Sequence, residues 1–238
     1  MNDRNIFQIT WENSRGSISL TVVLVCVAMF VAVAGLDLVR IVSRNASVSV
    51  LGLSYVGIVH HLWLFQFITA PLMHANLTHL LFNMLSLWML GPDVEKAVGR
   101  GRYVAFSVLC AVASMIGYLL FNWGTSIVVI GYSGVIFGIL VAQAVLFPDQ
   151  MMAIFAFFPI KMKYGVILLG AVELYLTMSP EKAGIANSAH LFGGVTGFLC
   201  LKAFRWADNV KASHPKPRRI PALKQVLRKQ RVDIPREL

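Results

Sequence analysis

Gly131-Tyr132-Ser133-Gly134, followed by the apolar run from Val135 to Phe147, is the stretch on which the predicted fold and chemistry of this chain turn. Glycines allow backbone segments to pack closely, and a serine where a helix begins can present its hydroxyl without steric cover. Ser133 is therefore a candidate nucleophile. Small residues also serve simply to pack helices in membranes, which is the alternative interpretation. The rest of the chain decides between the two by whether it supplies partners for Ser133.

The composition is that of an integral membrane protein. Of the 238 residues, 57% are hydrophobic and 13% are charged, with a mean hydropathy of +0.70. Soluble domains are about a quarter charged, so a soluble class is excluded. The three cysteines lie in apolar runs without CxxC or Cys-His spacing, and we expect neither a metal nor another cofactor.

Positive charge is concentrated in the C-terminal tail. The net charge is +10, and 11 of the 21 Lys and Arg residues fall between Lys202 and the C-terminus. Such a tail favours anionic membrane lipid, where each basic residue near the surface adds about 1 kcal/mol. Nucleic-acid binding is not expected, because aromatic residues are not interleaved with the basic ones.

Six apolar segments have the composition of membrane spans, which predicts an all-α bundle of six transmembrane helices. They cover residues 18–36, 76–90, 103–121, 133–147, 164–178 and 189–204, within a core of 18–205. A polar segment, 1–17, precedes the core, and the basic tail, 206–238, follows it. We expect an interfacial loop with short helices between Asp37 and Met73, and the second span to end at Gly91-Pro92. The apolar stretch from Met151 to Pro159 is too short to span.

Basic residues in the connecting segments predict the orientation. With the N-terminus inside, most of them lie in the inner segments, and only Arg40, Arg44 and Lys182 lie in the outer ones. Lys and Arg stay on the cytoplasmic side of a membrane, so both termini are predicted to be cytoplasmic. Ser133 then lies in the outer half of the bilayer.

Histidines and an asparagine inside the spans could serve Ser133, since polar residues there are costly and need a reason. His79 and Asn83 are four residues apart in the second span, which places both on one helix face, and His74 precedes them. In the sixth span His190 lies one turn before Gly193-x-x-x-Gly197, which matches Gly134-x-x-x-Gly138 in the fourth. If these two small-residue faces meet, His190 lies beside Ser133.

Together these residues are suited to nucleophilic catalysis. A serine needs a base to take its proton, and a neutral imidazole such as His190 can do so. His79, Asn83 and the Ser133 N–H could stabilise the oxyanion of the tetrahedral intermediate. The alternatives are a satisfied buried histidine for His190 and a polar clamp between helices for His79 and Asn83.

Three motifs resemble the signatures of the rhomboid intramembrane serine proteases, in order and content. The resemblance covers residues 65–197, and its motifs are His74-x-x-x-x-His79-x-x-x-Asn83, Gly131-Tyr132-Ser133-Gly134 and Ala189-His190-Leu191-Phe192-Gly193-Gly194-Val195-Thr196-Gly197. It implies a six-helix rhomboid-like bundle that hydrolyses a peptide bond in or near the transmembrane helix of a protein substrate. A bacterial inner membrane fits this compact form.

The resemblance also implies a role for each residue. Ser133 would be the nucleophile and His190 the base, forming a dyad without a carboxylate, and His79, Asn83 and the Ser133 amide would form the oxyanion hole. His74 would be a structural or water-organising residue, and Phe137 would place a ring against the His190 imidazole. The supporting glycines are Gly131, Gly134, Gly193 and Gly197.

The resemblance further implies a lid and shows one departure. The fifth helix and the loop from Met178 to Ser188 would move to admit substrate. The tryptophan-arginine pair of many members is replaced by Phe65-Gln66, which puts the usual loop anchoring in doubt. Two alternative functions are an inactive relative that binds membrane clients, and a small transporter that uses the histidines with Glu173 as a proton or metal path.

Overall fold

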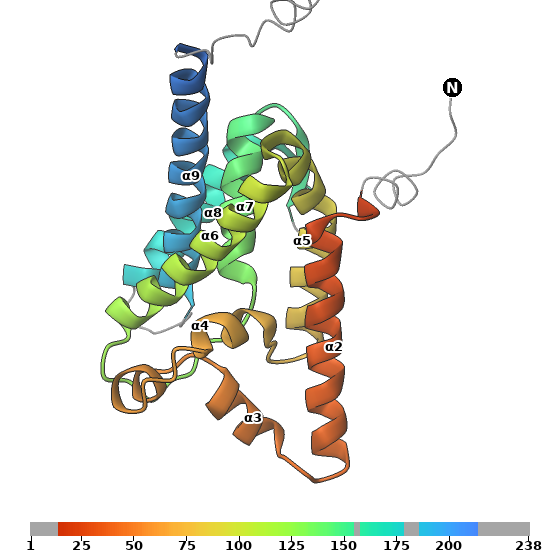
Figure 1. Ribbon diagram of the computed structural model, residues 1–238, viewed down its shortest axis with the longest axis vertical. Helices are drawn as coiled ribbons and strands as arrows, with labels where there is room; N and C mark the ends of the chain where they lie inside the picture. Colours follow the sequence, from red (N-terminus) through yellow and green to blue (C-terminus); the bar gives the residue numbers. More distant parts are fainter. Residues whose placement is uncertain (1–13, 155–157, 179–185, 214–238) are drawn as a thin grey trace, which may run out of the picture. The chain divides into compact units, whose positions relative to one another are not determined.

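The computed structural model describes residues 14–154, 158–178 and 186–213, and they are mostly helical (Figure 1). The chain forms two compact units, residues 1–204 and 205–238. The described part of the second unit is the C-terminal end of the last helix. The long elements are α2 (Ile18–Leu38), α5 (Leu77–Val98), α6 (Arg100–Phe121), α7 (Ser133–Leu146), α8 (Met162–Met178) and α9 (Asn187–Ser213).

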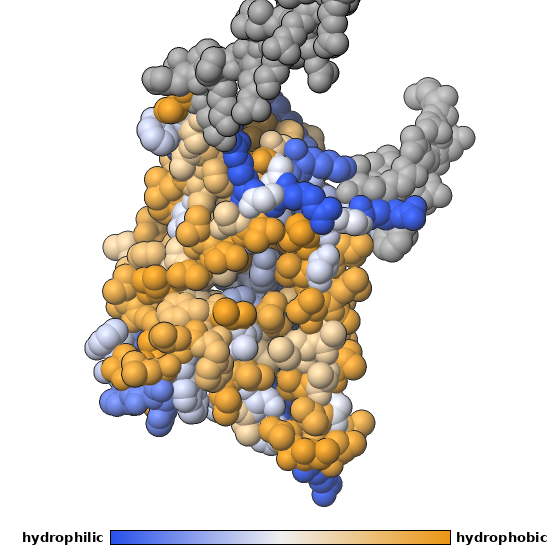
Figure 2. Space-filling view, in the orientation of Figure 1, coloured by the Kyte–Doolittle hydropathy of each residue, from blue (hydrophilic) through white to orange (hydrophobic). Residues whose placement is uncertain are grey.

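Helices suited to a membrane are present in the described part of the chain. By length and composition, α2 and α6 can each cross a bilayer, and α7 is a shorter apolar helix. Figure 2 shows apolar side chains spread over the middle of the first unit, with hydrophilic side chains gathered toward its two ends. The large side chains on this surface include Leu24 and Val31 of α2, which are about three-fifths exposed. Such a surface is suited to lipid rather than water.

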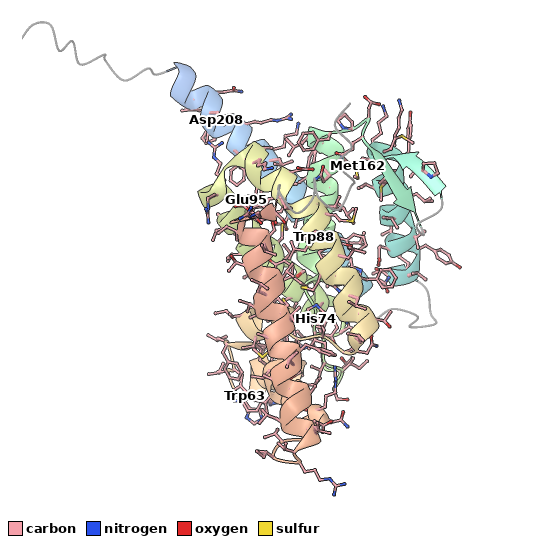
Figure 3. All side chains as sticks on the ribbon, turned by 90° about the vertical axis from the view of Figure 1, so that its right-hand side faces the viewer. Trp63, His74, Trp88, Glu95, Met162 and Asp208 are labelled. Atoms are coloured by element: carbon pink, nitrogen blue, oxygen red, sulfur yellow. The ribbon has the colours of Figure 1, made fainter. Side chains whose placement is uncertain are left out.

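A polar corner joins the N-terminal end of α2 to the last turns of α5. Ser17 caps α2 by accepting the Leu20 N–H at 3.0 Å, and the Glu95 carboxylate accepts the Ile18 N–H at 2.9 and 3.1 Å. Figure 3 shows Glu95 beside that end of α2. These contacts satisfy backbone donors that a helix leaves unpaired at its start.

The predicted end of the second span at Gly91-Pro92 is wrong as a helix boundary, because α5 continues to Val98. Pro92 lies within the helix and is buried there. The absence of a side chain at Gly91 lets α5 lie against Ser19 and Tyr103. Packing of α5 on its neighbours therefore outweighs the helix-breaking tendency of the proline.

The segment between α2 and α5, which is predicted to be an interfacial loop, contains short helices, as expected. They are α3 (Arg44–Leu51), η1 (Val56–His60), α4 (Gln66–Thr69) and η2 (Ala70–Leu72). Gln66 is fully buried, donates from Nε2 to the Val50 carbonyl at 2.9 Å and accepts the Ser54 N–H at 3.2 Å. The loop therefore has an anchor at the position where the sequence departs from the family pattern.

The prediction of a purely helical chain needs one correction. Strands β1 (Met151–Ile154) and β2 (Phe158–Lys161) form a small antiparallel pair between α7 and α8, with Met151 opposite Lys161. The stretch is too short to span a membrane, and pairing its two halves satisfies the backbone instead.

α7 is central to the first unit and packs against α5, α6 and α8. The core around it includes the buried side chains of Val135, Ile139, Phe106 and Leu87. α9 continues to Ser213, beyond the predicted end of the sixth span at 204. Of the predicted segments, residues 1–13 of the N-terminal segment, 179–185 of the lid and 214–238 of the tail lie outside the described residues.

Candidate active site

Ser133 is the first residue of α7, and the loop elements hold the segment that leads to it. Leu53 and Val129 exchange backbone hydrogen bonds at 2.9 and 3.0 Å, and the Gly131 N–H donates to the Ala70 carbonyl at 2.9 Å. Gly131 has a φ of +120°, a conformation that side chains other than hydrogen disfavour. The turn thereby delivers Ser133 to the helix N-terminus, where backbone N–H groups point away from the helix.

The two glycine pairs of α7 and α9 meet. A methyl group at Gly193 would overlap the Gly134 backbone, and one at Gly197 would lie 2.7 Å from the Gly138 carbonyl oxygen. Only hydrogen fits at these positions, so the helix backbones are in direct contact. We call this contact, formed by Gly134, Gly138, Gly193 and Gly197, the glycine seam. It brings the first turn of α9 to the first turn of α7.

Ser133 and His190 lie within hydrogen-bond distance as a result of the seam. Ser133 Oγ is 2.8 Å from His190 Nε2. The Phe137 ring stacks on the imidazole with a centroid separation of 4.4 Å and an interplanar angle of 5°. An apolar cavity of about 140 Å³ between α7, α8 and α9 borders His190 and Phe137. The ring is thus held between a hydroxyl and an aromatic face, largely away from water.

A carboxylate contacts the other nitrogen of the His190 imidazole. The dyad implied by the family resemblance has no such carboxylate. Glu173 Oε1 of α8 is 3.0 Å from His190 Nδ1, and Glu173 Oε2 accepts a hydrogen bond from Asn187 Nδ2. From the sequence, Glu173 is considered only as part of the proton or metal path of the alternative transporter, and no contact with His190 is assigned to it. The available signals were a lone acidic residue in the apolar part of α8 and an asparagine three residues before His190.

The polar residues of α5 flank the same turn. The N-cap Asn76 accepts the His79 N–H at 2.8 Å, which fixes the first turn of α5. A methyl group at Gly131 would lie 2.8 Å from His79 Cε1 and Nε2 and 3.8 Å from Ser133 Oγ. The imidazole edge of His79 and the hydroxyl of Ser133 therefore border the same glycine.

His79 Nδ1 accepts the Ala75 N–H at 3.4 Å, which leaves Nε2 as the nitrogen that carries hydrogen in the neutral ring. Asn83 is buried, and its Nδ2 donates to the His79 carbonyl at 2.8 Å. Within the described residues no hydrogen bond joins Asn83 to Ser133. The structure therefore brings His79 to the serine and places Asn83 one turn further along α5.

His74 and an arginine outside the motifs complete the surroundings. The His74 and His79 rings meet edge to face at 5.1 Å, and His74 lies near the first turn of α5 (Figure 3). Arg44 Nη2 donates to the carbonyls of His74 and Ala75 at 2.9 and 2.8 Å. Arg44 thus holds the loop that leads into α5. Nothing in its sequence context distinguishes Arg44 from the other basic residues of the connecting segments.

Comparison with known proteins identifies the family. A family model described as "Rhomboid domain" matches residues 60–206. "Rhomboid-like protein 15" of Arabidopsis thaliana is 29% identical over 155 residues, which cover 60% of this chain and 37% of that protein. "Putative rhomboid protease YdcA" of Bacillus subtilis is 31% identical over 152 residues, covering 60% of this chain and 68% of that protein.

A third relative, "Rhomboid protease GlpG" of Yersinia pestis, is 25% identical over 203 residues, which cover 80% of this chain and 63% of that protein. The chain thus spans between about one third and two thirds of the length of these relatives. The family match includes α5 to α8, most of α9 and the Ser133–His190 contact. The chain belongs to the rhomboid family and is an integral membrane protein.

Proposed function

We propose that this protein is an intramembrane serine endopeptidase that hydrolyses a peptide bond in or near the transmembrane helix of a substrate protein. The observation that carries the proposal is the 2.8 Å contact between Ser133 Oγ and His190 Nε2 at the start of α7. The names of the Bacillus and Yersinia relatives support a protease at the level of the family. No cofactor enters the reaction.

In the proposed reaction, His190 Nε2 takes the Ser133 hydroxyl proton while Oγ attacks the scissile carbonyl carbon. The carbonyl π electrons move to oxygen and give a tetrahedral oxyanion. His190 then gives its proton to the leaving amine as the C–N bond breaks, which leaves an acyl group on Ser133. Water attacks this ester with His190 again as base, and the second product leaves with Ser133 restored.

The oxyanion would be stabilised by the His79 imidazole, the Asn83 side chain and the Ser133 N–H. His79 Nε2 borders the serine across Gly131, and the Ser133 N–H belongs to the open first turn of α7. Asn83 Nδ2 carries two N–H groups and donates one of them to the His79 carbonyl, so the second N–H would serve the oxyanion. One such donor is worth about 3 kcal/mol of barrier.

The proposed topology has six spans, formed by α2, α5, α6, α7, α8 and α9, with both termini in the cytoplasm. The basic residues of the connecting segments support this orientation. A bacterial inner membrane would be the location, and the basic tail would lie on anionic lipid. The substrates would be transmembrane proteins, reached by movement of α8 and the segment that follows it.

The proposal predicts that Ser133→Ala abolishes turnover. The purified protein, in detergent, is incubated with a model transmembrane substrate and, separately, with a fluorophosphonate probe that forms a covalent bond to an activated serine. We expect cleavage and labelling by the wild type, with cleavage at least about 1,000-fold slower in Ser133→Ala and His190→Ala because nucleophile and base act as a unit.

A folded Ser133→Ala variant that still cleaves and labels would refute the assignment. A folded wild type that does neither would instead favour the inactive, client-binding class. Circular dichroism and thermal unfolding of each variant serve as the controls for folding.

A further inference from the structure

Glu173 is a carboxylate in an apolar helix, and both of its oxygens are engaged by α9. Oε1 lies 3.0 Å from His190 Nδ1, and Oε2 accepts from Asn187 Nδ2. Asn187 and His190 are three residues apart, so their side chains leave the same face of α9 toward α8. An acidic residue inside a membrane helix is costly unless it is paired. The pairing here is made to the candidate base.

The surroundings keep this contact largely from water. The side chains of Glu173 and His190 are 14% and 17% exposed, and Asn187 is buried. On its other sides the imidazole meets Ser133 Oγ at Nε2 and the stacked Phe137 ring. The ring is therefore constrained at both nitrogens and on one face. A hydrogen bond to a carboxylate in such an environment is stronger than the same bond in water.

We propose that Glu173 is a positioning residue that acts through His190, so that the chain uses a Ser133–His190–Glu173 triad in place of a dyad. The inference rests on the proposed peptidase function. The carboxylate accepts the Nδ1–H of the neutral ring, which leaves the Nε2 lone pair directed at the Ser133 hydroxyl. This is the tautomer that a general base requires.

The carboxylate also matters during the reaction. When Nε2 takes the serine proton, the imidazole carries hydrogen on both nitrogens and a positive charge. Glu173 lies against that charge and keeps its own, since the proton passes from Nε2 to the leaving amine and never to the carboxylate. Asn187 holds the second oxygen and thereby fixes the direction of the first.

Glu173→Gln tests this assignment, because glutamine keeps the size of the side chain and removes the charge. In the purified full-length protein we expect kcat for a model transmembrane substrate to fall by about 100-fold or more, while KM changes by less than about 2-fold. The loss of the carboxylate costs roughly 10⁴-fold in soluble triad hydrolases. Glu173→Asp, which retains the charge, is expected to keep more activity than Glu173→Gln.

Thr177→Ala is the matched control, one turn further along α8. Among the residues that the structure describes, Thr177 Oγ1 donates only to the Glu173 backbone carbonyl, at 2.8 Å, and this variant is expected to keep the wild-type kcat. Asn187→Ala is the second variant, for the case that Glu173→Gln does not fold. It leaves the carboxylate in place with one support removed, and kcat is expected to fall by about 3- to 10-fold.

A spectroscopic signature separates positioning from simple packing. In ¹⁵N-histidine-labelled protein, the His190 signals are assigned by their absence in His190→Ala. We expect the Nδ1–H tautomer in the wild type and a mixture of tautomers in Glu173→Gln. An unchanged kcat and an unchanged tautomer in a folded Glu173→Gln variant would overturn the inference while leaving the peptidase proposal intact.

A wild type that neither cleaves nor labels would overturn both the peptidase function and the triad. The tautomer measurement would then report only on the contact between Glu173 and His190. If the wild type is active and Glu173→Gln is unfolded, a wild-type kcat in Asn187→Ala would refute the positioning role.

Discussion

Glu95 and Glu173 are both carboxylates on largely apolar helices, yet their partners differ in kind. Glu95 is 5% exposed and accepts the Ile18 N–H at the start of α2, with Arg100 Nε 3.9 Å away. Glu173 instead faces two side chains of α9, Asn187 and His190. One carboxylate completes a helix terminus, and the other completes the surroundings of an imidazole.

The same group, a glutamate carboxylate, can therefore serve either the stability of the fold or the proposed reaction. A backbone N–H keeps its proton in every state of the folded protein, so Glu95 meets a constant partner. In the proposed reaction His190 gains and loses a proton, so Glu173 meets a partner whose charge changes. We call the contacts of Glu95 with the start of α2 the capping corner. Substitutions in the capping corner should change mainly the stability of the protein. Substitutions in the glycine seam or at Glu173 should change mainly its activity.

Gly193→Ala should separate the two helices at the seam and give the largest effect among substitutions outside Ser133, His190 and Glu173. An added methyl group would overlap the Gly134 backbone, so α7 and α9 must separate and the Ser133–His190 contact must lengthen. We expect substrate cleavage to fall by at least about 100-fold and the melting temperature to fall by about 5 °C or more. Cleavage assays and thermal unfolding in detergent measure the two effects.

Gly194→Ala is the matched control for this prediction. Its methyl group would lie 3.3 Å from Val141 Cγ2, a side-chain atom that can shift. We expect cleavage within about 3-fold of the wild type. Equal losses in the Gly193 and Gly194 variants would show that the seam does not depend on backbone contact.

Glu95→Ala should break the capping corner and leave the chemistry alone. Loss of the carboxylate leaves the part-buried N–H of Ile18 and the buried N–H of Ser19 without their acceptor, which costs about 2 kcal/mol. We expect the melting temperature to fall by about 5 °C, with kcat per folded molecule within about 2-fold of the wild type. Thermal unfolding and active-site titration with a fluorophosphonate probe give these two values.

Arg100→Ala is the control within the corner. Its side chain is 68% exposed and lies 3.9 Å from Glu95, so a shift of no more than about 1 °C is expected. A drop in kcat of Glu95→Ala beyond the loss of folded protein would contradict the division between the two regions.

Local patterns explain what could be predicted from the sequence. Ser133 begins α7 and Ile18 begins α2, as the apolar runs indicate. The glycine pairs are visible because a four-residue spacing repeats on one helix face, and the structure brings them together. The same spacing relates His79 to Asn83. These features depend on residues within one or two helix turns of each other.

Apart from the meeting of the glycine pairs, features that arise between elements were missed. Glu173 and His190 come from α8 and α9, and nothing within either helix states that they face each other. Likewise, α5 passes through Pro92 because Gly91 packs on Ser19 and Tyr103 of other helices. The sequence alone does not decide whether a proline ends a helix or which partner an isolated acidic residue contacts, because both depend on the neighbouring elements of the fold.

Asp149 is a third carboxylate and lies between α7 and β1. Because its side chain is exposed, its contribution to stability should be the smallest of those considered. Its hydrogen bonds from Lys163 Nζ at 2.9 Å and Lys161 Nζ at 3.1 Å hold its pKa below the ordinary value of 3.8. A carboxylate whose pKa is lowered by folding contributes stability above the unfolded pKa, and loses it as the pH falls through the folded value. The contribution of Asp149 is therefore present at pH 7 and is lost as the pH falls below 3.8 and through the lowered pKa.

Water screens this pair, since the Asp149 side chain is 64% exposed. The melting temperature of Asp149→Asn should lie within about 2 °C of the wild type at pH 7, and the two should converge as the pH falls through the lowered pKa of Asp149. Thermal unfolding of both proteins across this range isolates Asp149 from other groups that titrate. An equal drop in melting temperature at pH 7 for Asp149→Asn and Glu95→Ala would contradict this prediction. It would show that the contribution of Glu95 to stability does not depend on its burial. A smaller effect that vanishes in acid would show that the contribution of a carboxylate depends on its partners and on its exposure to water.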